Sequence, residues 1–185
     1  GKKGDGRWGD SDGKYNIPVI SSGLKSYTIS ETKYRGKFGN KEVISALEGS
    51  GTADRFYVMA LNDIDLSVHK WNTNGSMSIV TQTGFGTGKS NTAAVMEQYT
   101  GDLWGLIGTQ VEQGWFVPSK EEWSAFAEEL GINSSNYSST FGLSDWYWSS
   151  SQSYTNGAWF AHFCDGYMGS YRVGYDGNVR LSATF

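Results

Sequence analysis

The sequence predicts an α+β fold built mainly from short strands and tight turns. Glycine accounts for 25 of the 185 residues and proline for only 2, a balance that suits tight turns better than long helices. Aromatic residues make up 15% of the chain and charged residues 18%, which excludes a disordered chain and a coiled coil. Two segments have helical periodicity, whereas the C-terminal quarter alternates strand-forming residues with turns.

The first part of the chain is predicted to be a tether followed by short elements. Residues 1–16 are rich in glycine and charge, so we expect a tether or an edge segment there and a single domain over residues 17–185. The apolar run Phe56–Leu61 predicts a central strand. The other elements expected in this part are strands at Ile17–Ile20 and Tyr27–Ser30 and a short helix at Glu42–Leu47.

Two helices are predicted in the middle of the chain. Lys89–Tyr99 has the Ala, Met and Glu content of a helix. In Ser119–Leu130, Ser119 and Glu122 have the spacing of a capping box, and Gly131 follows as a stop signal. The apolar face of this second helix consists of Trp123, Phe126, Ala127 and Leu130.

The segment from Trp146 to Phe185 predicts an antiparallel β-meander. Asp-Gly pairs, typical of hairpin turns, occur at Asp165-Gly166 and Asp176-Gly177. Side chains alternate between the two faces of a strand, so residues 158–164 should present one face to the core and the other to a ligand. The core face would hold Trp159, Ala161 and Phe163, and the ligand face Phe160, His162 and Cys164. The residues expected in the core of the whole protein are Trp123, Phe126, Trp146, Trp148, Trp159 and Phe163.

Charge and hydropathy exclude two classes of partner. Residues 1–41 hold nine basic and four acidic side chains, and the remainder holds six basic and fifteen acidic ones, so we expect no nucleic-acid surface there. No apolar run approaches the roughly 20 residues of a membrane helix, and we expect no membrane span. Because the chain starts at Gly1 without a leader pattern, we expect it to be a piece of a longer protein whose signal or anchor lies elsewhere.

Motifs for cofactors each fail on spacing or ligand count. Gly84–Ser90 resembles a phosphate loop but lacks one glycine at the required position, and a turn before a helix is the better interpretation. Asp10–Gly13 lacks the further ligands of a calcium loop. With one cysteine and two histidines in the chain, a zinc site is poorly supported, and we expect no cofactor.

The single cysteine, Cys164, raises the possibility of an enzyme because His162 would lie on the same strand face. A nucleophilic pair also needs an orienting carboxylate, and no buried one is evident in the sequence. Asp63 and Asp65 form another candidate carboxylate pair, for which a hydrogen-bonded structural role is the better interpretation. The sequence therefore favours a protein that is not an enzyme.

Residues 84–185 resemble a known family. The stretches GWFVPSKEEW, YWSSSQ, AWFAHF followed by DGY, and NVRLSATF are similar to bacterial and phage domains with the C-type lectin fold, which include the variable proteins of diversity-generating retroelements. The resemblance implies two helices packed on a twisted antiparallel sheet that displays a hypervariable surface near the C-terminus. Formylglycine-generating enzymes of this fold use two cysteines, and sugar lectins use calcium-ligand triplets, neither of which occurs here.

The resemblance also implies which residue types can vary. Retroelement mutagenesis of adenines in AAY codons does not produce Met, Trp, Lys, Glu or Gln, and the stretch Phe160–Asn178 contains one residue of these types, Met168. We therefore expect a variable region at about residues 150–178. Its mixture of Tyr, Gly, Ser and Asp is typical of binding surfaces.

The function predicted is non-enzymatic binding of a protein or cell-surface ligand, on a phage virion or a bacterial cell surface. The alternative is a carbohydrate-binding module that stacks Trp and Tyr on sugar rings. The expected ligand-binding residues are Phe160, His162, Cys164, Tyr167, Gly169, Ser170, Tyr171, Tyr175 and Asp176, with Tyr154 and Asn156 as further candidates.

Overall fold

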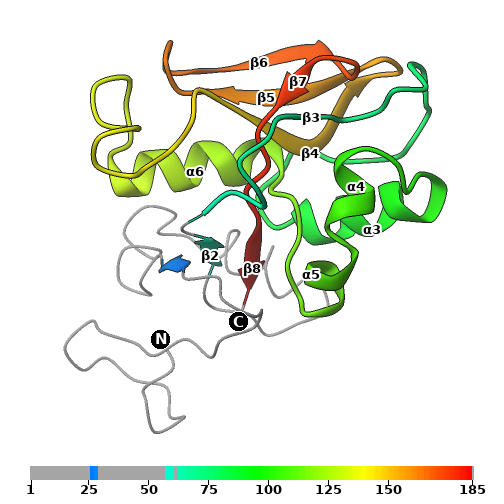
Figure 1. The fold of residues 1–185 in the computed structure, drawn as a ribbon, viewed down its shortest axis with the longest axis horizontal. Helices are drawn as coiled ribbons and strands as arrows, with labels where there is room; N and C mark the ends of the chain where they lie inside the picture. Colours follow the sequence, from blue (N-terminus) through cyan, green and yellow to red (C-terminus); the bar gives the residue numbers. More distant parts are fainter. Residues whose placement is uncertain (1–25, 29–56, 61, 185) are drawn as a thin grey trace, which may run out of the picture.

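The computed structural model describes residues 26–28, 57–60 and 62–184 (Figure 1). The expected tether at residues 1–16, the turn at Asp10–Gly13, the strand at Ile17–Ile20 and the helix at Glu42–Leu47 lie outside the described residues. Within the described part, no helix has the length and apolar character needed to cross a bilayer.

Both predicted helices are confirmed. The helix opened by Ser119 has the expected capping box: the Ser119 hydroxyl accepts from the Glu122 amide, and the Glu122 carboxylate accepts from the Ser119 amide. It ends at Gly131, whose φ of 70° lies in the left-handed region that glycine tolerates. The other predicted helix, α3, follows a turn at Gly84–Gly86, which agrees with the expected turn before a helix. The helices described are α3 (Gly88–Gln98), α4 (Leu103–Leu106), α5 (Gly108–Glu112) and α6 (Lys120–Leu130).

The strands form three small antiparallel sheets, in the orders β1-β2-β8, β3-β7 and β4-β5-β6. The third is the first part of the meander predicted for Trp146 to Phe185, whose last strands, β7 and β8, belong to the other two sheets; β2 is central in the first, as expected from its apolar run. The strands are β1 (Ser26–Thr28), β2 (Tyr57–Ala60), β3 (His69–Lys70), β4 (Trp146–Tyr154), β5 (Gly157–His162), β6 (Tyr167–Arg172), β7 (Asp176–Gly177) and β8 (Ser182–Thr184).

One of the two predicted Asp-Gly turns is wrong. Asp165-Gly166 lies in the turn between β5 and β6, with Gly166 at a φ of 72°. Asp176-Gly177 instead forms strand β7 and pairs with β3, because the chain already turns at residues 173–175. The chain therefore leaves the meander after β6 and ends in a different sheet, beside β2.

The β4-β5-β6 sheet is covered on both faces. Helix α6 packs against β4 and β5 on one face, where Trp123, Phe126 and Phe163 belong to one core cluster. On the other face the β3-β7 ribbon crosses in front of the sheet (Figure 1), and a second core cluster includes Trp148 and Phe160. β4 and β5 are therefore mostly buried, whereas β6 stays partly exposed.

The second core corrects the predicted faces of β5. Phe160, expected on the ligand face, is completely buried and packs edge-to-face on Trp148 with ring centroids 4.5 Å apart. Trp159, expected in the core, is only half-buried, and the Lys120 ammonium lies 3.9 Å from the centre of its ring. Trp146 is also half-buried rather than in the core. The alternation of faces was predicted correctly, but the outward face is covered by distant parts of the chain.

Candidate functional site

One face of the β4-β5-β6 sheet carries a group of aromatic side chains along β6, which we call the aromatic surface. Strand register creates it, because Trp146 of β4 pairs with His162 of β5, which pairs with Tyr167 of β6. Paired residues of neighbouring strands point to the same face. The aromatic surface consists of Trp146, His162, Tyr167, Tyr171 and Tyr175.

Ring contacts hold the aromatic surface in one arrangement. Trp146 lies edge-to-face on His162 at 4.6 Å and beside Tyr171 at 5.7 Å between ring centroids. His162 contacts Tyr167 at 5.2 Å, and Tyr171 contacts Tyr175 at 6.0 Å. Such pairs stabilise a fixed geometry beyond the area they bury. The aromatic surface is therefore ordered before any ligand arrives.

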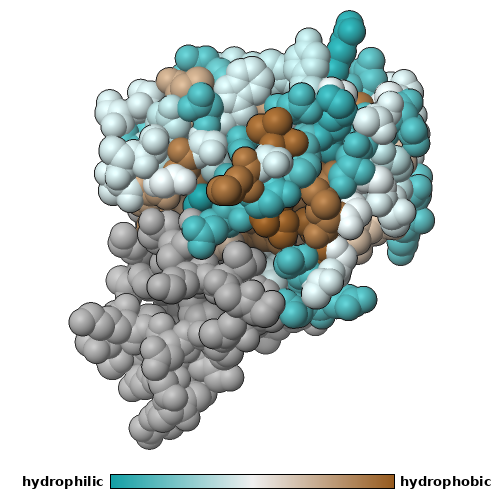
Figure 2. Space-filling model, in the orientation of Figure 1, coloured by the Kyte–Doolittle hydropathy of each residue, from teal (hydrophilic) through white to brown (hydrophobic). Residues whose placement is uncertain are grey.

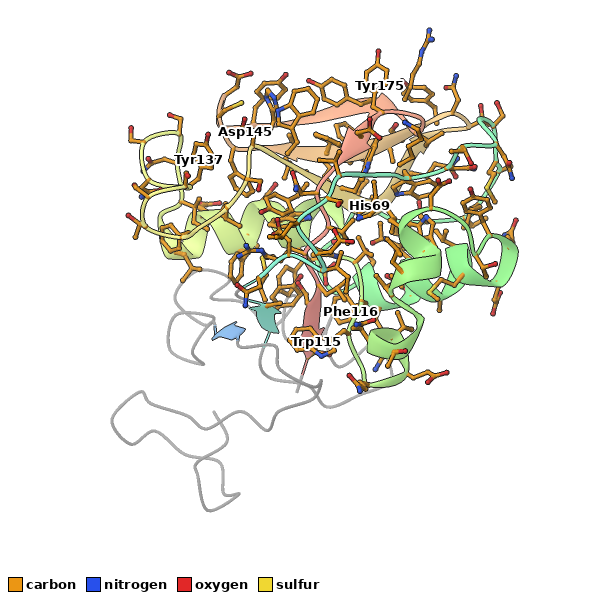
Figure 3. The ribbon with its side chains drawn as sticks, in the orientation of Figure 1. His69, Trp115, Phe116, Tyr137, Asp145 and Tyr175 are labelled. Carbon is orange, nitrogen blue, oxygen red and sulfur yellow. The ribbon has the colours of Figure 1, made fainter. Side chains whose placement is uncertain are left out.

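The surface is accessible at its outer edge. Tyr167 and Tyr175 are 48% and 49% exposed, and Tyr175 points away from the protein (Figure 3). Tyrosine is coloured near the middle of the hydropathy scale, and the β6 end of the molecule is mainly pale and teal in Figure 2. The site is thus amphipathic rather than a strongly hydrophobic patch.

Gly169 lies beneath the two tyrosines of β6. The hydroxyls of Tyr167 and Tyr171 lie 2.9 Å apart, joining the residues on either side of Gly169. A β-carbon at Gly169 would come within 2.8 Å of the Tyr171 ring and 3.1 Å of the Tyr167 ring. Its φ lies outside the left-handed region, so the need for glycine here is steric.

Tyr171 keeps its proton at neutral pH. The hydrogen bond with Tyr167 is the main cause that raises the pKa of Tyr171 to about 12, and burial adds to it. A similar hydrogen bond to Asp145, on the neighbouring loop, raises the pKa of Tyr137 to about 12. The surface accordingly presents neutral hydroxyl groups that can donate and accept hydrogen bonds.

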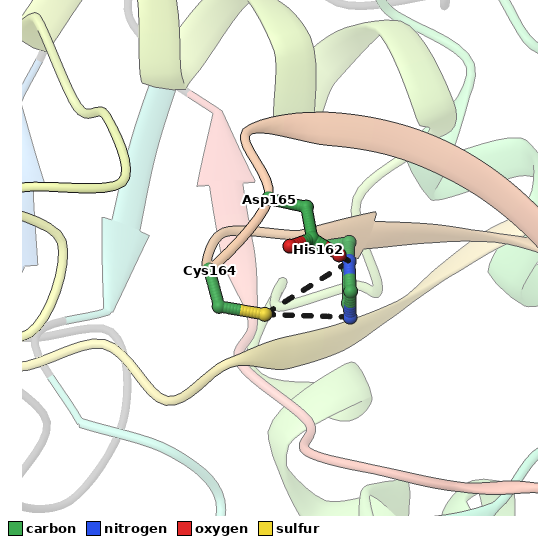
Figure 4. A group of neighbouring side chains, drawn as sticks. All are labelled: His162, Cys164 and Asp165. Carbon is green, nitrogen blue, oxygen red and sulfur yellow. Dashed lines mark hydrogen bonds and ion pairs between the residues drawn. The ribbon is translucent and has the colours of Figure 1, made fainter.

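The turn after β5 brings a histidine, a thiol and a carboxylate together (Figure 4). The Asp165 carboxylate lies 2.8 Å from Nδ1 of His162. The Cys164 Sγ lies 3.4 Å from Nε2 and 3.9 Å from Nδ1 of the same ring. A sulfur on the Nε2 lone-pair line would be much farther from Nδ1, so these similar distances place the thiol beside the ring rather than in line with a nitrogen.

A groove lies on the other side of the same turn, between α6 and the β5-β6 hairpin. It has a volume of about 360 Å³. Ala161, Phe163 and Met168 form part of its apolar lining, and His162 and Tyr167 belong both to this groove and to the aromatic surface. The two features therefore adjoin.

The predicted site residues fall into three groups. His162, Cys164, Tyr167, Gly169, Tyr171 and Tyr175 lie along one face of β5 and β6 and in the turns that flank β6, although His162 itself is buried. Ser170 faces the opposite side and bonds Ser153, while Tyr154 and Asn156 lie at the far end of the β4-β5 hairpin. Phe160 is buried, and Asp176 forms an exposed ion pair with Lys70 at 3.0 Å.

Sequence reasoning missed two members of the site. Trp146 was assigned to the core, although its register with His162 places it in the aromatic surface. Asp165 was assigned only a turn role, and its spacing of three residues from His162 across a tight turn was the available signal.

The Asp63 and Asp65 carboxylates do have hydrogen-bonded roles: Asp63 accepts from Arg180 and Asp65 lies 2.8 Å from His69 Nε2.

Comparisons of this chain with family models, with curated proteins and with solved structures find no match.

Proposed function

We propose that this protein is a non-enzymatic ligand-binding protein of the C-type lectin type, with the aromatic surface as its binding site. The observation that carries the proposal is the group of Trp146, Tyr167, Tyr171 and Tyr175, which contact one another along the partly exposed strand β6. The ligand is a protein or another component of a cell surface.

The chemistry of these side chains supports that role. Tyrosine and tryptophan bury a large area on binding while losing little conformational entropy, because each has only two rotatable side-chain bonds. The contacts between their rings restrict them further in the free protein. Their hydroxyl groups add directional hydrogen bonds, and the adjoining groove offers room for an apolar side chain of the ligand.

The position of the thiol supports a binding role over catalysis. A general base must share a proton with its nucleophile along a hydrogen bond. Cys164 Sγ instead lies beside the His162 ring, at similar distances from both nitrogens. The aromatic side chains around this histidine are better suited to contact than to proton transfer.

We also propose that retroelement mutagenesis varies residues of this surface. The diversified positions would be those on β6 and the adjoining turns whose side chains reach solvent, such as Tyr167 and Tyr175. Such a protein would act on a phage virion or a bacterial cell surface. Sequencing the flanking DNA tests this part: a near-repeat of the codons for about residues 150–178 beside a reverse transcriptase gene is expected, and its absence argues against a retroelement.

The binding site is tested by replacing three tyrosines together. The triple variant Tyr167→Ser, Tyr171→Ser and Tyr175→Ser should keep the fold at lower stability, because Tyr167 and Tyr175 are half exposed whereas Tyr171 packs against Phe160; its melting midpoint verifies that it is folded. Labelled wild-type protein is incubated with a panel of bacterial species, and cell-bound label is measured. Binding to any positive species should fall at least tenfold in the triple variant, since central aromatic contacts are often worth 2 kcal/mol or more.

Tyr154→Ser is the matched control, because Tyr154 is equally exposed but its ring lies beside Gly157 rather than in the aromatic surface. It should bind as the wild type does. If the triple variant stays folded and binds with unchanged affinity, the aromatic surface is not the binding site.

A carbohydrate-binding module is the second candidate. Exposed tyrosines, of which Tyr154, Tyr167 and Tyr175 are each about half exposed, are the side chains on which sugar rings stack. A glycan array separates the two functions. Binding to defined sugars that is lost in the triple variant favours the module, whereas protease treatment of target cells that removes binding favours a protein ligand.

A further inference from the structure

We propose that His162, Cys164 and Asp165 form a binding site for a zinc ion. The three side chains come from four consecutive residues at the end of β5 and in the turn that follows it. Their donor atoms all lie within 4.8 Å of one another (Figure 4). The site goes beyond the proposed binding function and does not depend on it.

The donor types fit zinc. Imidazole nitrogen, thiolate sulfur and carboxylate oxygen are the three kinds of protein ligand that zinc accepts, whereas calcium and magnesium prefer oxygen alone. Three protein ligands leave a fourth tetrahedral position for water. Reasoning from the sequence had weighed only Cys164 and His162, and Asp165 supplies the third donor.

The donor atoms must shift to reach the spacing of a tetrahedral site. With Zn–N and Zn–O bonds of about 2.0–2.2 Å and a Zn–S bond of about 2.3 Å, ligand atoms lie roughly 3.3–3.6 Å apart. Asp165 Oδ2 lies 2.8 Å from His162 Nδ1, which is shorter, and Cys164 Sγ lies 3.9 Å from the same nitrogen, which is longer. Because the sulfur lies beside the ring, a zinc ion bound to Nδ1 requires the Cys164 side chain to rotate toward the Asp165 carboxylate.

The surroundings hold the histidine and leave the other two ligands free to adjust. The His162 side chain is 7% exposed and is held between the rings of Trp146 and Tyr167. The Asp165 side chain is 58% exposed and Cys164 is half-buried, so both can rotate and an ion can enter from solvent. With zinc on Nδ1, the neutral imidazole carries its proton on Nε2, and the thiol gives its proton to the buffer as the thiolate bonds to zinc, so one proton is released for each ion bound.

Cobalt titration of the whole chain, kept reduced with a phosphine, tests the site. Co²⁺ takes the same tetrahedral ligands and reports a thiolate ligand through a sulfur-to-cobalt charge-transfer band in the near ultraviolet. We expect this band to saturate at one ion per chain and to disappear when Zn²⁺ displaces the cobalt. Zinc should also raise the melting midpoint, because it binds the folded state.

Two substitutions in the turn, at half-buried Cys164 and exposed Asp165, locate the ligands while the histidine itself is kept. Cys164→Ser should abolish the band, and Asp165→Asn should weaken cobalt binding at least about tenfold, the usual cost of losing a partner in a metal site. His69→Gln is the matched control, because His69 also contacts an aspartate, at 2.8 Å, but has no thiol beside it, and it should leave binding unchanged. Metal-free melting midpoints verify that each variant is folded.

Three results would overturn the proposal. The first is the absence of the charge-transfer band at saturating cobalt. The second is a band whose cobalt affinity is the same in Asp165→Asn as in the wild type. The third is a complex of two chains per ion in sedimentation, because it would mean that cysteines of separate molecules hold the metal.

Discussion

Glu122 is a buried ionisable residue whose carboxyl group takes part in the capping hydrogen bonds of α6. Burial raises the pKa of Glu122 to about 7 from an ordinary 4.5, against the lowering effect of its hydrogen bonds with Ser119. The protonated carboxyl is therefore favoured in the folded state more than in the unfolded state. Its contribution to stability is fully present below pH 4.5 and is lost as the pH rises through about 7.

Glu122→Gln should remove this pH dependence, because the amide keeps the acceptor oxygen and cannot ionise. Relative to the variant, the wild type should lose on the order of 3 kcal/mol of unfolding free energy between about pH 5 and about pH 8. Urea unfolding at the two pH values measures the difference. Glu121→Gln, the same change at an exposed neighbour, should leave the wild-type profile unaltered. Parallel profiles for wild type and Glu122→Gln would contradict the assignment.

For single residues, the sequence predicts a contact best when the two partners are close together in the chain. Ser119 and Glu122 form their capping box within one turn of helix, so a motif of four residues was sufficient. The partnership of His162 with Asp165 depends on the path of the turn between them, which the sequence indicated only as an Asp-Gly pair. The sequence therefore does not show the direction in which the Asp165 side chain points from the turn.

Among the elements, strand β6 requires a glycine at position 169, and this requirement can be tested. Gly169→Ala should displace the Tyr167 and Tyr171 rings, because its β-carbon would lie within 2.8 Å of one ring and 3.1 Å of the other. We expect loss of their mutual hydrogen bond and a destabilisation of about 1–3 kcal/mol. Thermal melting gives the stability, and tyrosine fluorescence or NMR ring signals give the displacement.

Gly174→Ala is the control for this substitution. Nothing lies within 4 Å of a β-carbon at Gly174, and its φ lies outside the left-handed region, so alanine should be tolerated there. Equal stability of the two variants would show that the tyrosine pair adjusts freely and that Gly169 is not needed.

The faces of β5 show why an element can be predicted and still be oriented wrongly. Alternation along the strand separated Trp159 from Phe160, as the structure has it. The sequence of β5 alone does not reveal that the β3-β7 ribbon, from two distant segments, covers Phe160. Whether one or both faces of a sheet are covered depends on the topology of the whole chain. When both faces of a strand are apolar, its own sequence pattern does not show which face is covered.

Across the whole molecule, a buried ion pair connects parts that are far apart in sequence. Asp63 follows β2, and its carboxylate accepts from Arg180 Nε at 2.9 Å and from the Tyr147 hydroxyl at 2.8 Å. The side chains of Arg180 and Asp63 are 3% and 14% exposed. Burial is the largest of the effects that together raise the pKa of Tyr147 to about 12, so its hydroxyl remains a donor.

Asp63→Asn should destabilise the protein by about 3–5 kcal/mol, because it leaves the Arg180 guanidinium buried without its counter-charge. Guanidinium chloride unfolding measures the loss. Asp176→Asn removes the partner of Lys70 in an exposed pair and should cost less than about 1 kcal/mol. A small effect of Asp63→Asn would mean that water or the Gly142 carbonyl, which already accepts from Arg180, compensates the cation.

The pairing of β8 with β2 also determines when the protein can fold during synthesis. The β4-β5-β6 meander can form from local contacts, which are fast. Residues before it in the chain, among them Trp71 and Trp104, cover part of its second face, but Val173, Val179 and Leu181 of the same core cluster follow it, and β2 gains its last partner only at β8. A ribosome paused before these residues would therefore leave the cover of Trp148 and Phe160 incomplete, and the nascent chain would be a substrate for chaperones until β8 emerges.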